Sequence, residues 1–327
     1  MKALVFHTFG GPEVLTLQDI PEPAIQAGTV KVRTRAIGLN YADIYRRRGN
    51  YHLVGEPPYI LGYEGAGVVE EVAPDVEGIQ VGDRVGFADA PHGNAELVLV
   101  PADRVIKLPE GISYEDAAAV LLQGLTAQYL VNDSYAVKQG DRVLVHAAAG
   151  GVGQLLIQLC KARGAQVIGL TSSPEKREAA LAAGADEVFL YNTDWVSDVL
   201  KWSAVSAEVA ATGLDVAYDS VGSTLMDSFK VVRIKGTVVF FGMAGGDPAP
   251  VDPRMLMDTS KTLTGGDLWN HITSAEERSR RGSELFADML EGRLRLSEPT
   301  TFRLADGAEA HRYLESRAST GKILLIP

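Results

Sequence analysis

Cysteine is nearly absent from this chain of 327 residues, because Cys160 is the only one. A single thiol can form no intramolecular disulfide and cannot build a structural zinc site of several cysteines. The six histidines form no His-Glu-x-x-His motif and no cluster with the cysteine. We therefore expect no metal site, and a reducing compartment is consistent with this count. Cys160 falls on the apolar face of a predicted helix, where a buried hydrophobe is the better interpretation than a nucleophile.

Positive charge is also scarce: 31 Lys and Arg stand against 42 Asp and Glu, a formal net charge of -11. Nucleic-acid binding needs clustered cations, so this class of partner is excluded. The longest uncharged stretch runs from Val143 to Cys160 and contains His146, glycines and glutamines. A loop between a buried strand and a buried helix explains it better than a membrane span. The N-terminus shows no secretory signal, and we expect a cytoplasmic protein.

The length suggests about two domains. Up to Ser113 the sequence contains short β-branched runs separated by Gly, Pro and Asp, which predicts a β-rich domain. Beyond Ser113, apolar strands alternate with helices, which predicts an α/β domain with a parallel, doubly wound sheet. The strands expected in this second part are 142–145, 166–170, 187–190, 214–218 and 237–241.

A glycine-rich turn follows the first strand of the α/β part. It fits the dinucleotide fingerprint as Ala148-x-Gly150-x-x-Gly153, with Gly151 and Val152 inside it and alanine in the first glycine position. The fingerprint requires a tight turn, close approach of a pyrophosphate to the backbone, and close packing of helix on strand. A helix N-terminus then offers free N–H groups to the phosphates. We interpret the turn as a dinucleotide site rather than a plain structural turn.

The end of the second strand distinguishes the two dinucleotides. About 20 residues beyond the turn, NAD enzymes place an acid that binds the ribose 2′-hydroxyl. Here Ser172 and Ser173 occupy that place, no carboxylate is present, and Lys176 and Arg177 follow. Hydroxyls and positive charge suit a 2′-phosphate, so the sequence favours NADPH over NADH. The alternative is that Ser173 only caps a helix while the two cations are solvated.

Three other features complete the reading of the residues alone. Phe241 and Gly242 fall at the end of the expected strand 237–241, at the carboxyl edge of the sheet, so we expect backbone contacts with the cofactor there. Arg46-Arg47-Arg48 is the strongest basic run, and we interpret it as a solvated loop. His146 precedes the glycine-rich turn, and we interpret it as structural rather than as an acid catalyst.

With these residues in place, the sequence resembles the quinone oxidoreductase, or zeta-crystallin-like, branch of the medium-chain dehydrogenase/reductase superfamily over essentially its whole length. Seven landmarks stand in the family's order: Ala-Ile-Gly-Leu-Asn-Tyr-Ala-Asp at 36–43, Gly-Tyr-Glu-Gly-Ala-Gly at 62–67, Val-Gly-Asp-Arg-Val at 81–85, Gly-Leu-Thr-Ala at 124–127, Ala-Ala-Ala-Gly-Gly-Val-Gly at 147–153, Tyr-Asp-Ser-Val-Gly at 218–222 and Leu-Glu-Ser-Arg at 314–317.

The resemblance bears on the reaction. Zinc alcohol dehydrogenases of the superfamily carry Gly-His-Glu where this chain has Gly62-Tyr63-Glu64, and their cysteine ligand has no counterpart near Asn40. Without zinc, alcohol oxidation lacks its Lewis acid. The resemblance thus implies metal-free hydride transfer from NADPH to a quinone. The alternatives are an NADPH-dependent 2-alkenal or enone reductase, which reduces an activated alkene, and a non-catalytic, crystallin-like NADPH-binding protein.

The resemblance also implies catalytic residues. The family places an asparagine and two tyrosines around the nicotinamide and substrate, and Asn40, Tyr45 and Tyr51 match them. Asn40 could bind the nicotinamide ribose or polarise a substrate oxygen, and Tyr45 could stack or donate a proton. Tyr45, Tyr51 and water stay open as proton donors, and either tyrosine could instead be an aromatic anchor.

Further cofactor-binding residues follow from the same resemblance. Thr126 corresponds to a threonine near the nicotinamide carboxamide, and Lys176 with Tyr191 matches the lysine and tyrosine at the 2′-phosphate. Arg317 corresponds to a C-terminal arginine near the cofactor, its alternative being a surface ion pair. Gln123 departs from the pattern, since some relatives have lysine there.

The implied domain organisation is discontinuous. Residues 1–123 and 265–327 are expected to form a groES-like substrate domain, and residues 124–264 a Rossmann-type NADPH-binding domain. Homodimerisation through the strand near Thr262 to Gly265 is a family expectation.

Overall fold

The computed structural model describes residues 1–205 and 212–327. These residues form two compact units: Met1–Leu125 with Ile272–Pro327 (unit 1), and Thr126–His271 (unit 2). One unit is therefore discontinuous in sequence. The assignment of a substrate domain and an NADPH-binding domain stays a prediction. No helix among the described residues is both long and apolar enough to span a membrane.

Unit 2 contains a six-stranded sheet in which every pairing is parallel, with the order β11-β10-β9-β12-β13-β14. Its strands are β9 (Arg142–Val145), β10 (Gln166–Thr171), β11 (Glu187–Leu190), β12 (Leu214–Asp219), β13 (Val232–Phe240) and β14 (Thr262–Gly265). The chain moves outward from β9 in one direction and then from β12 in the other. This confirms the doubly wound Rossmann-type sheet, and its switch point lies between β9 and β12.

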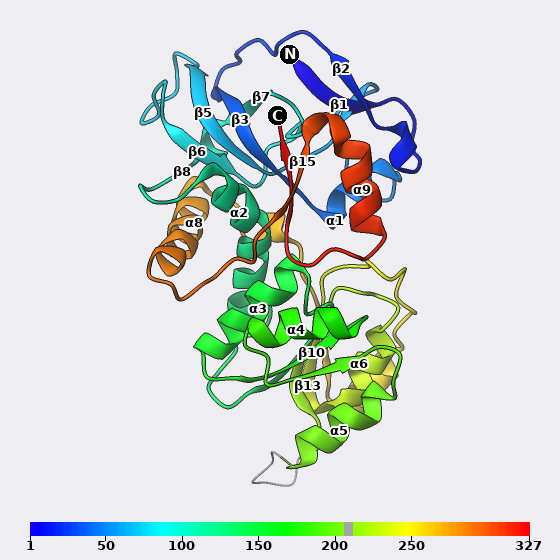
Figure 1. The fold of residues 1–327 in the computed structure, drawn as a ribbon. Coiled ribbons are helices and arrows are strands. Elements are labelled where there is room, and N and C mark those ends of the chain that lie inside the picture. Colours follow the sequence, from blue (N-terminus) through cyan, green and yellow to red (C-terminus); the bar gives the residue numbers. More distant parts are fainter. Residues whose placement is uncertain (206–211) are drawn as a thin grey trace. The chain divides into compact units, whose positions relative to one another are not determined.

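Helices connect these strands (Figure 1). They are α3 (Gly151–Ala162), α4 (Pro174–Ala182), α5 (Trp195–Val205), α6 (Leu225–Val231) and α7 (Pro253–Thr259). The helix α3 packs with α4, and α5 with α6. Trp195, Val199 and Phe229 form a buried cluster with Leu144 and Ile168 of the sheet. Helix α6 ends at Val231, because the chain enters β13 directly at Val232.

Unit 1 is rich in β-structure, as expected for the groES-like part. One sheet has the order β15-β16-β3-β5-β6-β8, with β7 also paired to β3, and a smaller sheet has the order β2-β1-β4. The strands are β1 (Lys2–Phe6), β2 (Thr16–Asp19), β3 (Thr29–Leu39), β4 (Tyr59–Ile60), β5 (Gly65–Val72), β6 (Arg84–Phe87), β7 (Leu97–Pro101), β8 (Ile106–Lys107), β15 (Thr300–Arg303) and β16 (Ile323–Ile326). The C-terminal strand β16 pairs antiparallel with β3, from the N-terminal part of the chain (Figure 1).

The helices of unit 1 are α1 (Tyr41–Arg47), α8 (Ala275–Leu290) and α9 (Gly307–Glu315), and α2 (Tyr114–Tyr129) runs from unit 1 into unit 2. In the first part of strand β3, buried residues alternate with Lys31, Arg33 and Arg35, and the buried Val30 and Val32 pack with Val69 and Phe87. Burial of β-branched side chains on neighbouring strands, here β3 and β5, stabilises the sheet.

Helix α1 corrects one expectation. The Arg46–Arg48 run was interpreted as a solvated loop, yet the first two arginines are 1% and 0% exposed and lie in α1. Arg47 donates to Gly10 O, contacts His311 Nδ1 at 2.8 Å and pairs with Glu315. Each guanidinium is buried because a carboxylate and backbone carbonyls compensate its charge.

Candidate functional site

The glycine-rich turn of unit 2 has the geometry that the dinucleotide fingerprint requires. Gly150 is the N-cap of α3, with φ −75°, and Gly151 opens the helix. A Cβ on Gly153 would lie 2.5 Å from Ala147 O, and one on Gly150 would lie 3.2 Å from the same oxygen. A larger residue at 153 would therefore push α3 off the strand. The residues present fit a dinucleotide phosphate, because the backbone is open to it at a helix N-terminus.

Tyr191 contacts the two residues that begin this turn, His146 and Ala147. Its hydroxyl accepts a hydrogen bond from the N–H of Ala147 at 2.9 Å and lies 3.2 Å from His146 Nδ1. Burial lowers the pKa of His146, although the Asp219 carboxylate opposes this shift, and its Nε2 lies 2.9 Å from Ser228 Oγ. The structure thus places His146 in a support role, as the sequence predicted. It also gives Tyr191 a contact that the resemblance did not suggest.

A buried carboxylate anchors the same edge of the sheet. We call His146, Asp219, Thr224 and Ser228 the Asp219 cluster. Asp219 ends β12 and accepts hydrogen bonds from the N–H groups of Val221 and Gly222, each at 2.9 Å, and from the Thr224 and Ser228 hydroxyls, each at 2.8 Å. Burial alone would raise the pKa of Asp219, but His146 and these donors outweigh it and hold the pKa below its usual value.

The strand β10 ends where the sequence indicated a 2′-phosphate site. Ser172 is exposed just beyond the strand, and Ser173 caps α4 by accepting from Lys176 N at 3.4 Å. Arg177 instead faces β11, where it donates to Glu187 Oε1 at 2.9 Å and Val188 O at 3.0 Å. Arg177 is therefore engaged with β11, and Lys176 lies in the first turn of α4, four residues after Ser172 in the chain.

Two further predicted residues follow β13. Phe241 N donates to Asp219 O at 2.9 Å, and a Cβ on Gly242 would lie 3.1 Å from Ser220 O. Because all six strands are parallel, residues that follow β9, β10, β11 and β13 meet at one edge of the sheet. The fold of unit 2 therefore brings together Gly150, Gly151, Val152, Gly153, Ser172, Lys176, Tyr191, Phe241 and Gly242. Thr126 lies in α2, near its C-terminal end.

The remaining predicted residues lie in unit 1. Asn40 is the N-cap of α1, Tyr45 lies within that helix, and Tyr51 follows it. The rings of Tyr45 and Tyr51 meet edge to face with centroids 6.4 Å apart. Arg46 lies with its guanidinium carbon 5.1 Å from the centroid of Tyr51 and 3.8 Å from that of Tyr63. The structure thus brings the two candidate tyrosines together beside a buried cation.

Asn40 itself is embedded in charged groups. We call Asn40, Asp43, Glu64 and Lys322 the Asn40 cluster. Asn40 Nδ2 donates to Glu64 Oε2 at 2.8 Å, and Lys322 Nζ lies 2.5 Å from the same carboxylate oxygen. Burial raises the pKa of Asp43, while the nearby Arg46 guanidinium opposes the shift. The side-chain amide of Asn40, which the resemblance implied as a site residue, therefore binds to Glu64 and Lys322, which were not among the predicted site residues.

Arg317 follows α9 in a left-handed conformation, with φ 59°. Burial raises the pKa of Tyr41, and the charge and hydrogen bond of Arg317 act in the opposite direction. Within unit 1, Arg317 therefore interacts with the first residue of α1, next to Asn40 in the chain.

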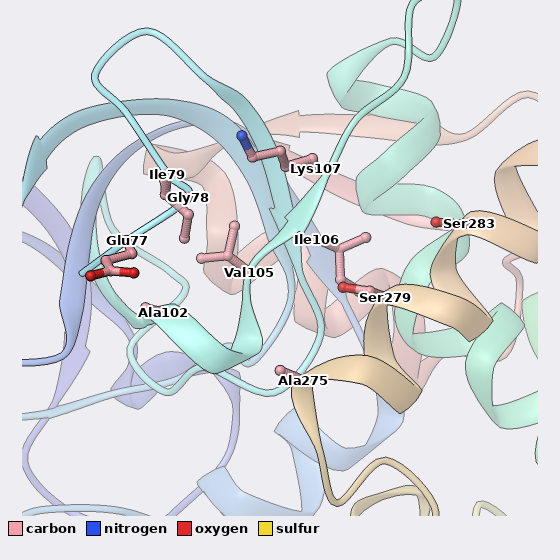
Figure 2. Close-up of a pocket in the computed structure, with 10 residues that line it drawn as sticks. All are labelled: Glu77, Gly78, Ile79, Ala102, Val105, Ile106, Lys107, Ala275, Ser279 and Ser283. Atoms are coloured by element: carbon pink, nitrogen blue, oxygen red, sulfur yellow. The ribbon is translucent and has the colours of Figure 1, made fainter.

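A separate hollow in unit 1 contains none of the predicted residues. Its volume is ≈ 350 Å³, and Figure 2 shows Glu77 from the loop after β5, Lys107 of β8, and Ser279 and Ser283 of α8 among the side chains around it. Lys107 is already paired with Asp83 at 2.8 Å. The hollow is thus lined by other residues than those predicted to bind the cofactor or to take part in catalysis.

Tyr63 stands where the sequence resemblance predicts the Gly-His-Glu histidine of zinc alcohol dehydrogenases. Burial raises its pKa, and the Arg46 guanidinium against its ring opposes this shift. Among the residues that the structure describes, no group of three or more His, Cys, Asp or Glu could hold a metal ion.

Comparison with known proteins agrees with this architecture. Residues 26–110 match the family model described as alcohol dehydrogenase GroES-like domain, and residues 151–279 match that described as zinc-binding dehydrogenase. Together with the switch-point sheet and its glycine-rich turn, these matches define an oxidoreductase of the medium-chain dehydrogenase/reductase class.

Full-length relatives narrow the class. The chain is 39% identical to a quinone oxidoreductase of Pseudomonas aeruginosa, covering 100% of this chain and 99% of that protein. It is 36% identical to a 2-haloacrylate reductase of a Burkholderia species, with the same coverage. The solved structure of Escherichia coli quinone oxidoreductase complexed with NADPH superposes with a TM-score of 0.94 at 36% identity, covering 100% of both chains. The chain belongs to the quinone oxidoreductase family.

Proposed function

We propose that this protein is an NADPH-dependent reductase that transfers a hydride to a quinone without a metal ion. The observation that carries the cofactor assignment is the end of β10, where residues 171–173 include no carboxylate and Lys176 follows, with Glu175, in the first turn of α4. A 2′-phosphate gains hydrogen bonds and a favourable charge there. The NADPH complex of the Escherichia coli relative supports the same cofactor.

In this proposal, different residues bind different parts of NADPH. The turn Gly150–Gly153 and the N-terminus of α3 would hold the pyrophosphate, while Ser172, Lys176 and Tyr191 would hold the 2′-phosphate. Thr126, Phe241, Gly242 and Arg317 would contact other parts of the cofactor. Bound NADPH supplies the hydride. Asn40, Tyr45 and Tyr51 would orient the acceptor, so rate enhancement comes from positioning and electrostatics rather than from a covalent nucleophile.

The quinone assignment is supported by the names of several relatives, whereas the 2-haloacrylate reductase supports an activated alkene as the acceptor. Steady-state oxidation of NADPH should be measured with 1,2- and 1,4-quinones, 2-alkenals and 2-chloroacrylate. We expect the highest kcat/KM with a quinone. Turnover confined to the alkenes would replace the quinone proposal by the alkene reductase. Tight NADPH binding without turnover on any acceptor would leave a non-catalytic binding protein.

The cofactor proposal has its own test. Lys176→Ala should raise the KM for NADPH by about tenfold or more, as loss of a charged contact costs about 1.5–3 kcal/mol, and should leave the KM for NADH nearly unchanged. Lys201→Ala is the matched control, since Lys201 is exposed on α5 and pairs with Asp198. Equal effects of Lys176→Ala on both cofactors would remove this lysine from the phosphate site.

We further propose a cytoplasmic homodimer. The strand β14 is an edge of the unit 2 sheet, and its free side could pair with a second copy. Sedimentation velocity should give about twice the 35.0 kDa chain mass. A monomer across micromolar concentrations would refute the dimer without affecting the cofactor proposal.

A further inference from the structure

Lys322 is a buried cation that the proposed function does not use. It immediately precedes β16, and the register that pairs Ile323 with Leu39 sets it beside Asn40. Its side chain is 4% exposed, and that of Glu64 is fully buried. A lysine is rarely so deeply buried unless its charge is paired, and here Nζ lies 2.5 Å from Glu64 Oε2 and 2.9 Å from Asn40 Oδ1.

These contacts fix which way the Asn40 amide points. Its Nδ2 donates to Glu64 Oε2 at 2.8 Å, and its Oδ1 accepts from Lys322 Nζ at 2.9 Å. An ionised carboxylate can only accept hydrogen bonds, and an ammonium can only donate them. Turning the amide over would place NH₂ against the ammonium and oxygen against the carboxylate, so one orientation is strongly favoured.

The structure also shows which contact of Asn40 a ligand could replace. Gln123 Nε2 is a second donor to Oδ1, at 3.4 Å, which is longer than the lysine contact. A ribose hydroxyl or another neutral donor could take the place of Gln123 while Lys322 keeps the oxygen in position. Oδ1 would then remain an acceptor that faces the ligand.

We propose that Lys322 is a positioning residue, which, together with Glu64, fixes the amide of Asn40 so that Oδ1 is presented to the nicotinamide side of the cofactor or to the substrate. This role rests on the proposed function, because Asn40 is a ligand-contacting residue only under it. Lys322 itself touches neither substrate nor cofactor in this scheme.

Three variants separate positioning from charge balance. Lys322→Met alone leaves Glu64 buried without its cation and could prevent folding. Lys322→Met with Glu64→Gln removes both charges and is expected to fold. Lys322→Met with Gln123→Lys returns an ammonium from α2, at a position whose side chain already reaches Asn40 Oδ1. Lys107→Met, at a half-exposed pair, is the matched control.

The first measurement needs neither cofactor nor turnover. In the protein labelled with ¹⁵N-asparagine, the Asn40 side-chain NH₂ signals, assigned by their loss in Asn40→Asp, should be shifted and protected from exchange. The neutral pair should lose this protection, and the Gln123→Lys variant should restore it. Unchanged signals in the neutral pair would overturn the proposal, whatever the protein catalyses.

The second measurement is binding and kinetics. With the neutral pair we expect kcat/KM to fall about 10- to 100-fold, the range that a displacement of about 1 Å can cause, and NADPH affinity measured by fluorescence titration to weaken. Gln123→Lys in the Lys322→Met background should not recover this loss, because its ammonium would occupy the contact at Asn40 Oδ1 that the ligand is expected to take. A neutral pair that folds and retains wild-type kinetics and NADPH affinity would show that Lys322 only balances Glu64. Absence of turnover in the wild type would refute the proposed function instead, while the NMR result would still decide the amide orientation.

Discussion

Glu64 of unit 1 and Asp219 of unit 2 are both completely buried carboxylates, and they are stabilised in different ways. Glu64 of unit 1 is compensated by a cation, with Lys322 Nζ at 2.5 Å, and by the N–H of Leu122 at 2.6 Å. Asp219 of unit 2 is surrounded by neutral donors, two backbone N–H groups and two hydroxyls. His146 is 3.8 Å from Asp219, but burial disfavours its charged form.

The difference bears on what each cluster is suited to do. A pair of full charges holds an amide between them in one orientation, which suits the placement of a polar side chain such as Asn40. A carboxylate that accepts from backbone N–H groups instead fixes the path of the chain, here the turn after β12 at the sheet edge. Unit 1 thus uses charge to orient a side chain, and unit 2 uses it to shape a loop.

The largest effect should come from removing the two charges by near-isosteric substitution. Glu64→Gln would leave Lys322 buried without a counterion, which typically costs about 3–5 kcal/mol. Asp219→Asn would weaken hydrogen bonds from neutral donors and should cost about 1–3 kcal/mol. Urea unfolding at pH 7, followed by signals from each unit, measures both. Equal losses would remove the distinction between the two clusters.

A smaller effect on the unfolding free energy is expected from the buried histidines, His311 of unit 1 and His146 of unit 2, and it should depend on pH. Burial, reinforced by Arg47, lowers the pKa of His311 to about 3. Between that value and the unfolded value near 6.5, the unfolded state binds more protons, so stability rises with pH across this window. We expect about 1 kcal/mol less stability at pH 5.5 than at pH 6.5 from this group.

His311→Gln should therefore flatten the pH dependence of the unfolding free energy between pH 5.5 and 6.5. His146→Gln should flatten it less, because Asp219 partly opposes the effect of burial on the pKa of His146. A His311→Gln protein with the wild-type slope would contradict this assignment.

The smallest loss of unfolding free energy is expected from an exposed charge cluster. This loss is the reference against which the cost of removing the buried charges can be judged. Arg280 on α8 pairs with Glu277 at 2.7 Å and Glu284 at 2.5 Å, and its side chain is 52% exposed. Arg280→Ala should cost only about 0.5 kcal/mol, and less in 0.5 M salt, because solvent screens such pairs. A loss comparable to that of Glu64→Gln would mean that burial does not determine the cost.

The α/β part was predictable because its signals are local. Alternating strands and helices, Gly150 at an N-cap and Pro174 after Ser173 are each encoded within a few residues, and the structure has them in those places. The helix α1 was missed, although Asp43 three residues after Asn40 is a capping signal: Asp43 Oδ2 accepts from Asn40 N at 3.0 Å.

The contacts that hold Asn40 in place could not be predicted, since the residues that make them are distant from one another in the sequence. Lys322 lies 258 residues from Glu64, and no spacing rule joins them. One indirect signal exists at Gly38, where a Cβ would lie 2.1 Å from Glu64 Oε2, so only glycine leaves room for the buried carboxylate. Arg46 and Arg47 were likewise assigned to solvent because their partners, except Asp43, are set by the tertiary fold.

The pairing of β16 with β3 has a consequence for how the chain matures. Unit 2 is one continuous segment and can fold as soon as it leaves the ribosome, whereas unit 1 waits for residues that are synthesised last. Until Lys322 arrives, Glu64 lacks its counterion and β3 lacks one neighbour. During synthesis, the nascent protein should therefore acquire a folded unit 2 before the Asn40 cluster is complete, and a chain that ends before Lys322 should never form that cluster.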